Sequence, residues 1–145
     1  MKPDFHGENC PTCNQLVKLY KRTIRHIDAW RLIKMYKLTK QYPDKVYFHI
    51  SEFSPTGFNT SSDFAKMRYC NLVEEMPNDD ETKRTSGFWR ITDEGKAFVE
   101  NRKTVPKYAL IFNKGLYGFM GPQQSISDRL GKRFNYAELM NGEAQ

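Results

Sequence analysis

The stretch from residue 68 to residue 100 most constrains how this chain can fold. It reads "RYCNLVEEM", then a charged segment, then "SGFWRITDEGKAFVE". The parts "LVEEM" and "FWRIT" carry the β-branched and aromatic residues of strands, whereas the segment between them is too charged to be buried. Thr92 is followed by two acids, which predicts a helix capped by Thr92 with its first turn at residue 93. The stretch therefore predicts two antiparallel strands that lead into a helix.

Two helices are predicted before this stretch. Residues 12–25 place Leu16, Leu19, Tyr20 and Ile24 on one side at helical spacing, which predicts an amphipathic helix. Asp28 is the expected N-cap of a second helix that ends at the Tyr42-Pro43 pair; one bent helix over 12–41 is equally allowed. The second helix is expected to bury Ala29, Leu32, Ile33 and Tyr36 and to turn Arg31, Lys34 and Lys37 away from the core.

The rest of the chain completes an α+β fold. A short strand is expected at 45–50, and a helix at 62–71 that is capped by Ser61 and buries Phe64 and Met67. Residues 108–121 predict a β-hairpin that turns at 113–115, with Gly115 at positive φ. Two short helices are expected after it. The predicted segments are a leader with a basic helix (1–27), a central domain (28–101), and a hairpin with short helices (102–145).

Charge is concentrated in the first third of the chain. The chain carries a net charge of +6, and residues 14–45 hold nine Lys or Arg against two Asp. If a polyanion is the partner, this region is where it would bind. Aromatic residues make up 14% of the sequence, enough to build a core, and no apolar run is long enough for a membrane span. The first residues lack the apolar segment of a signal peptide, so we expect a cytoplasmic protein.

The element order from Asp28 resembles the winged helix-turn-helix superfamily, in the style of the MarR and PadR regulators. "MRYCNLVEE" resembles the end of that family's recognition helix, and "GFWRITDEGKAFVE" resembles its second wing strand entering the next helix. In this interpretation Gly95 lets the helix pack close to the wing strands.

The resemblance implies double-stranded DNA as the partner, with the recognition helix in the major groove. It assigns groove-facing roles to five residues and the wing tip to two more. The groove-facing residues are Ser61, Ser62, Ala65, Lys66 and Tyr69. The wing-tip residues are Lys83 and Arg84.

Acids around the predicted wing argue for an alternative. Glu74, Glu75, Asp79, Asp80 and Glu81 would repel phosphates. They fit an adaptor or inhibitor that uses the winged-helix scaffold to bind a protein.

The predicted N-terminal helix could supply further phosphate contacts. Lys18, Lys21, Arg22 and Arg25 gather on one stripe, and none of them has an Asp or Glu four residues before or after it. The alternative is a solvated helix face.

Cys10 and Cys13 form a C-x-x-C pair, with His6 four residues before it. Two thiolates at this spacing can bind one zinc ion. The missing ligands could come from His6 and another local group, from His26, or from the same pair in a second copy of a homodimer. Two free thiols or a redox pair are the alternatives, and Cys70 is expected to be a structural thiol.

No phosphate loop, nucleophile elbow or zinc-protease motif is present in the sequence, so we expect no enzyme. The first hypothesis is a DNA-binding regulator or accessory protein of the phage or mobile-element type, whose members are often compact, basic and aromatic-rich. The second is the protein-binding adaptor or inhibitor. Neither hypothesis involves a membrane.

Overall fold

The computed structural model describes residues 4–14, 16–54, 64–77, 87–112, 115–132 and 134–141. The described part is mixed α+β, as predicted. Its α-helices are α1 (His26–Gln41), α2 (Asp93–Val99), α3 (Ile126–Leu130) and α4 (Tyr136–Asn141), and its 3-10 helices are η1 (Ile50–Glu52) and η2 (Phe64–Cys70). Its strands are β1 (Glu8–Asn9), β2 (Leu16–Val17), β3 (Tyr20–Arg22), β4 (Phe48–His49), β5 (Val73–Glu75), β6 (Phe88–Ile91), β7 (Val105–Phe112) and β8 (Gly115–Gln124).

The central helix α1 buries the predicted apolar stripe of Ala29, Leu32, Ile33 and Tyr36. It ends before Pro43, as expected, but it begins at His26 with Arg25 as its N-cap. The prediction of Asp28 as N-cap is wrong. Asp28 is the third residue of the helix, and its carboxylate accepts the backbone N–H of the N-cap residue Arg25 at 3.3 Å. An acid at this position satisfies a free N–H of the first turn just as a cap would.

Arg31 is buried rather than turned to solvent, which corrects the prediction for this residue. Its Nη1 lies 3.2 Å from Oδ1 of Asp28, and its Nε donates to the hydroxyl of Ser54 at 3.1 Å. Asp28 and Arg31 can both be buried because each lies one helical turn from an opposite charge. Lys37 also differs from its prediction, because its Nζ donates to the carbonyl oxygen of Leu139 in α4 at 2.8 Å.

The predicted strand pair is present and forms a three-stranded sheet in the order β4-β6-β5. Trp89 of β6 lies opposite Phe48 on one side and Glu75 on the other. Its ring meets the ring of Phe64 edge-on, with centroids 5.6 Å apart. Seven residues of this region and its flanking helices share one core: Phe64, Met67, Leu72, Val73, Trp89, Ile91 and Phe98.

The junction between β6 and α2 is closely packed, as predicted. Thr92 caps α2, and its hydroxyl accepts the backbone N–H of Gly95 at 2.9 Å. A β-carbon on Gly95 would lie 2.1 Å from the carbonyl oxygen of Leu72 and 2.7 Å from Cγ1 of Ile91. The absence of a side chain at Gly95 therefore allows α2 to lie directly against the sheet.

The predicted N-terminal helix over 12–25 is wrong, because this region forms strands. β1 pairs with β2, and β3 pairs antiparallel with β7, placing Tyr20 opposite Ile111 and Arg22 opposite Ala109. An isolated helix of this length is marginal in water. β3 instead obtains its hydrogen bonds from β7, a partner far along the chain that a local periodicity does not reveal.

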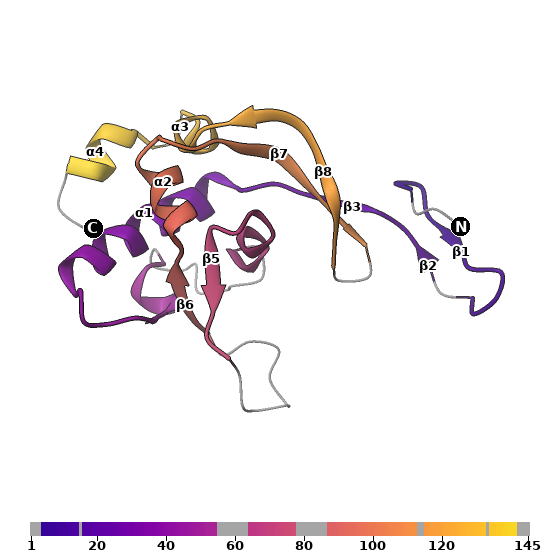
Figure 1. Ribbon diagram of the computed structural model, residues 1–145. Helices are drawn as coiled ribbons and strands as arrows, with labels where there is room; N and C mark the ends of the chain where they lie inside the picture. The colour runs from indigo at the N-terminus through magenta and orange to yellow at the C-terminus, as the bar shows by residue number, and fades with distance from the viewer. Residues whose placement is uncertain are drawn as a thin grey trace.

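The C-terminal region forms the predicted hairpin and two short helices. β7 and β8 complete a second sheet in the order β3-β7-β8, and this sheet curves over η2 and reaches toward the N-terminal leader (Figure 1). Residues 113–114 lie outside the described residues. Gly115 does not have the predicted positive φ, whereas Gly121, next to a register shift, has φ of 90°. α3 and α4 pack on α1.

Candidate nucleic-acid interface

The strand β3 turns alternate side chains to opposite faces of its sheet, as any strand does. Tyr20 and Arg22 therefore share one face, and Lys18, two residues before Tyr20, also lies near the Tyr20 ring. The Nζ of Lys18 lies 5.2 Å from the centre of the Tyr20 ring, and Cζ of Arg22 lies 5.5 Å from it. Each cation is within cation–π distance of the ring, which is 39% exposed.

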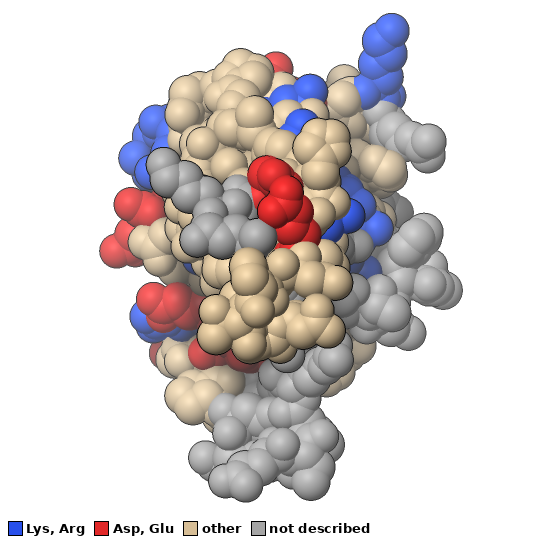
Figure 2. All heavy atoms as spheres, turned by 90° about the vertical axis from the view of Figure 1, so that its right-hand side faces the viewer, with Lys and Arg blue, Asp and Glu red and all other residues tan. Residues whose placement is uncertain are grey.

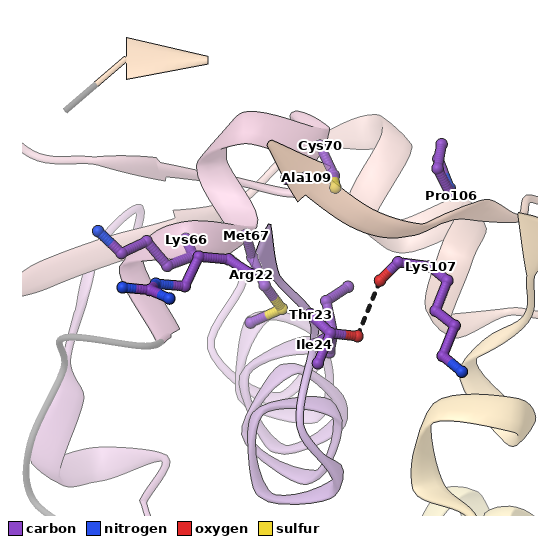
Figure 3. Close-up of a pocket in the computed structure, with 9 residues that line it drawn as sticks. All are labelled: Arg22, Thr23, Ile24, Lys66, Met67, Cys70, Pro106, Lys107 and Ala109. Atoms are coloured by element: carbon purple, nitrogen blue, oxygen red, sulfur yellow. Dashed lines mark hydrogen bonds between the residues drawn. The ribbon is translucent and has the colours of Figure 1, made fainter. Parts of the chain in front are cut away.

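A second cation–aromatic pair lies on η2, where Nζ of Lys66 is 6.0 Å from the Tyr69 ring. Lys66 and Arg22 line the same shallow hollow, together with Met67, Cys70 and Ala109. Figure 3 shows the Arg22 and Lys66 side chains extending in the same direction from β3 and η2. We call Lys18, Tyr20, Arg22, Lys66 and Tyr69 the basic–aromatic surface.

The opposite face of β3 carries a separate cluster. Nζ of Lys21 lies 4.9 Å from the ring of Phe5 and 5.2 Å from that of Tyr108, and Lys107 lies 5.3 Å from the same Tyr108 ring. Lys107 extends away from Arg22 and Lys66 (Figure 3). The region 18–22 therefore divides its cations between two faces, in place of the single stripe expected for a helix.

The structure brings four of the predicted DNA-contacting residues onto the basic–aromatic surface: Lys18, Arg22, Lys66 and Tyr69. Arg25 is not among them, because its Nε lies 3.1 Å from Oδ2 of Asp28. The predicted Ser61, Ser62, Lys83 and Arg84 lie outside the described residues. Tyr20 was missed because the helical interpretation assigned it to the core. The alternation Lys-x-Tyr-x-Arg over 18–22 is the signal that could have found it.

Two of the five acids near the predicted wing are described, and both have arginine partners. Oε2 of Glu74 accepts from Nε of Arg90 at 2.6 Å, and Oε1 of Glu75 lies 4.0 Å from Nη1 of Arg68. Asp79, Asp80 and Glu81 lie outside the described residues. These arginines offset part of the charge that would repel phosphates.

The face of the molecule at the leader end is not uniformly basic. Figure 2 shows Lys and Arg side chains mainly toward its margins, with acidic side chains among the remaining residues. An anion that binds here would therefore meet local clusters of cations rather than one continuous basic field.

Cys10 and Cys13 lie in the turn between β1 and β2, and both are free thiols. The backbone N–H groups of Cys13 and Thr12 hydrogen-bond to the Cys10 sulfur and lower the pKa of its thiol. Two thiols with such donors fit half of a zinc site. Within the residues described, the structure does not bring His6 or another ligand into a group of three with them.

Cys70 has the opposite environment. Burial at the end of η2 raises the pKa of its thiol to about 11, which agrees with the structural role predicted for it. The hollow beside it provides about 10 Å³ of space, roughly what one water molecule needs. It is too small to hold a substrate, so the cations around it, rather than the hollow, are the candidate contacts.

No family model, curated protein or solved structure matches the chain. Among the helices of the described ranges, none is long and apolar enough to cross a membrane.

Proposed function

We propose that this protein binds double-stranded DNA through the basic–aromatic surface, as a winged-helix regulator or accessory protein. The observation that carries the proposal is that Arg22 and Lys66 line the same hollow. The sequence suggested each as a DNA contact on separate grounds, and they extend together from β3 and η2 beside one hollow. Cations grouped on one side of a protein can contact several phosphates of one duplex.

The order of elements supports the winged-helix part of the proposal. From residue 26 the described chain runs through α1, β4, η1, η2, β5, β6 and α2. This is the order on which the resemblance to winged helix-turn-helix proteins rests. η2 takes the place of the recognition helix, although its described part is a 3-10 helix rather than an α-helix. Tyr20 and Tyr69 can pack against sugars while the cations contact phosphates.

The test compares two double variants with the same change in net charge. Arg22→Gln/Lys66→Gln alters the basic–aromatic surface, and Lys21→Gln/Lys107→Gln alters the opposite face. Binding of a labelled random-sequence duplex is measured by fluorescence anisotropy at several salt concentrations. Loss of two phosphate contacts should make the slope of log K against log salt shallower by about 1.8, at about 0.9 for each contact. The control pair should leave the slope nearly unchanged.

Equal effects of the two double variants would contradict the proposed surface, because net charge alone would then explain binding. Wild-type protein that fails to bind duplex at low salt would contradict DNA binding itself.

One observation favours the second candidate function, docking on a protein. β8 is an edge strand of its sheet, and four of its large apolar side chains are at least 39% exposed. These residues are Leu116, Tyr117, Phe119 and Met120. A long exposed edge can pair with a strand of another protein. If the wild-type chain does not bind duplex, β8 becomes the preferred functional surface. The double variant Tyr117→Ser/Phe119→Ser should then abolish binding of the partner protein without unfolding the core.

A further inference from the structure

The turn that carries Cys10 and Cys13 has a defined geometry. The backbone N–H of Asn14 donates to the carbonyl oxygen of Cys10 at 2.8 Å, and Asn14 has a left-handed φ of 61°. The turn brings the two thiols within hydrogen-bonding reach of each other, and the N–H groups of Thr12 and Cys13 point at the Cys10 sulfur. Two sulfurs on one side of a tight turn can occupy two corners of a zinc tetrahedron, while N–H donors stabilise the negative charge on the sulfur.

The remaining ligands are not supplied by the histidines or the other cysteine of the same chain. All three Cys and all three His lie within the described residues. In that part of the chain, no group of three or more His, Cys, Asp or Glu could hold a metal. A structural zinc ion normally has four protein ligands. The pair of thiols can therefore supply two of the four ligands that such an ion needs.

The position of the turn leaves it open to a second molecule. β1, β2 and the turn between them lie at the end of the fold farthest from α1 and α4 (Figure 1). Cys13 is exposed, and Phe5 and Leu16 of the same leader are 40% and 52% exposed. A second copy related by a two-fold axis would bring an identical pair of thiols to the first and cover these apolar side chains.

We propose that two copies of this chain share one zinc ion, held by Cys10 and Cys13 of each copy. Binding removes the protons of four thiols to solvent, and each sulfur donates one electron pair to the ion. The affinity for zinc should consequently fall as the pH is lowered, because protons compete for the same sulfurs. The site is independent of the proposed DNA binding and would exist in a protein that bound no DNA.

The experiment measures metal content and mass on the full chain, purified without chelator in medium containing zinc. We expect half a zinc ion per chain by mass spectrometry of the metal. Light scattering should give twice the chain mass of 17.1 kDa. A chelator should remove the ion and give monomers. Replacement of zinc by cobalt should produce a thiolate-to-cobalt charge-transfer band with the intensity of four thiolates per ion, a measurement that needs no variant to fold.

Variants distinguish Cys10 and Cys13 from His6 and Cys70 as ligands of the zinc ion. Cys10→Ser/Cys13→Ser should lose both zinc and the dimer, whereas His6→Ala and the control Cys70→Ala should keep both. Zinc-free protein, one zinc per monomeric chain, or a dimer that survives metal removal would each overturn the proposal.

Discussion

Replacing Gly95 by alanine tests the packing of α2 on its sheet. In an ordinary helix this change is stabilising by about 1 kcal/mol, because alanine has the higher helix propensity. Here the new β-carbon would lie 2.1 Å from the carbonyl oxygen of Leu72, whereas ordinary contacts begin near 3.4 Å. α2 would have to move by about 1 Å to relieve the clash.

The neighbouring backbone resists that movement. The oxygen of Leu72 already accepts the N–H of Thr92 at 3.1 Å, and the Thr92 hydroxyl donates to the carbonyl oxygen of Asn71 at 2.5 Å. Overpacking of a tight site costs about 1–3 kcal/mol, and the loss of these bonds adds to it. We expect Gly95→Ala to lower the free energy of unfolding by about 2 kcal/mol or more.

Urea denaturation followed by Trp fluorescence measures the effect. With a slope of about 2 kcal/mol per molar urea, the midpoint should fall by about 1 M. Gly118→Ala is the matched control, because a β-carbon there meets no atom within 4 Å. Its midpoint should stay within about 0.3 M of wild type, corresponding to about 0.5 kcal/mol. A Gly95→Ala protein as stable as wild type, or more stable, would refute the proposed close packing.

Three further predictions follow from named contacts. Asp28→Asn removes the carboxylate partner of buried Arg31 and should lower the free energy of unfolding, measured by urea denaturation, by about 3–5 kcal/mol. The control Asp44→Asn, at an exposed position, should change this free energy little. The Tyr36 hydroxyl, which donates to the Glu100 carboxylate at 2.6 Å, and Arg102 lower the pKa of Glu100. Ionised Glu100 therefore stabilises the fold above its unfolded pKa of about 4.3. This stabilisation is lost as the pH falls through the folded pKa. The stability difference between wild type and Glu100→Gln should accordingly be larger at pH 7 than at pH 2.5. A difference independent of pH would contradict the linkage. In metal-free protein at pH 8, iodoacetamide should modify Cys10 well before Cys70, because burial raises the pKa of the Cys70 thiol to about 11. Mass spectrometry of digests taken at successive times measures the order of modification. Equal rates for the two cysteines would contradict the prediction.

Local signals in the sequence predicted the central part of the fold. Thr92 as a cap, the apolar stripe of α1 and the strand pair around the charged segment depend on interactions within a few residues or on one buried face. Such features can be recognised from spacing and residue type alone. The largest error, the N-terminal helix, occurred where a partner distant in the sequence decides the structure. Residues 16–24 satisfy helical spacing, but β2 pairs with β1, and β3 obtains its hydrogen bonds from β7.

The candidate site was predictable only in parts. Arg22 and Lys66 were each suggested by the sequence, yet their proximity depends on the pairing of β3 with β7 and on the packing of β7 near η2. The burial of Arg31 could not be predicted from the sequence for a different reason. A charged residue on a helix is normally exposed, and the sequence alone does not reveal that Arg31 is buried beside Asp28 and Ser54.

The pairing of β3 with β7 also determines when the protein can complete its fold during synthesis. Tyr20 pairs with Ile111, the Thr23 hydroxyl donates to the carbonyl oxygen of Lys107, and Nε of Arg129 donates to the carbonyl oxygen of Ile24. During synthesis β3 therefore leaves the ribosome well before β7, the strand that supplies its hydrogen bonds, has been made. Folds with such distant contacts form slowly, and their unpaired strands are exposed to aggregation meanwhile. Translation time, rather than the intrinsic speed of helix or hairpin formation, should set how long β3 of each new chain remains unpaired.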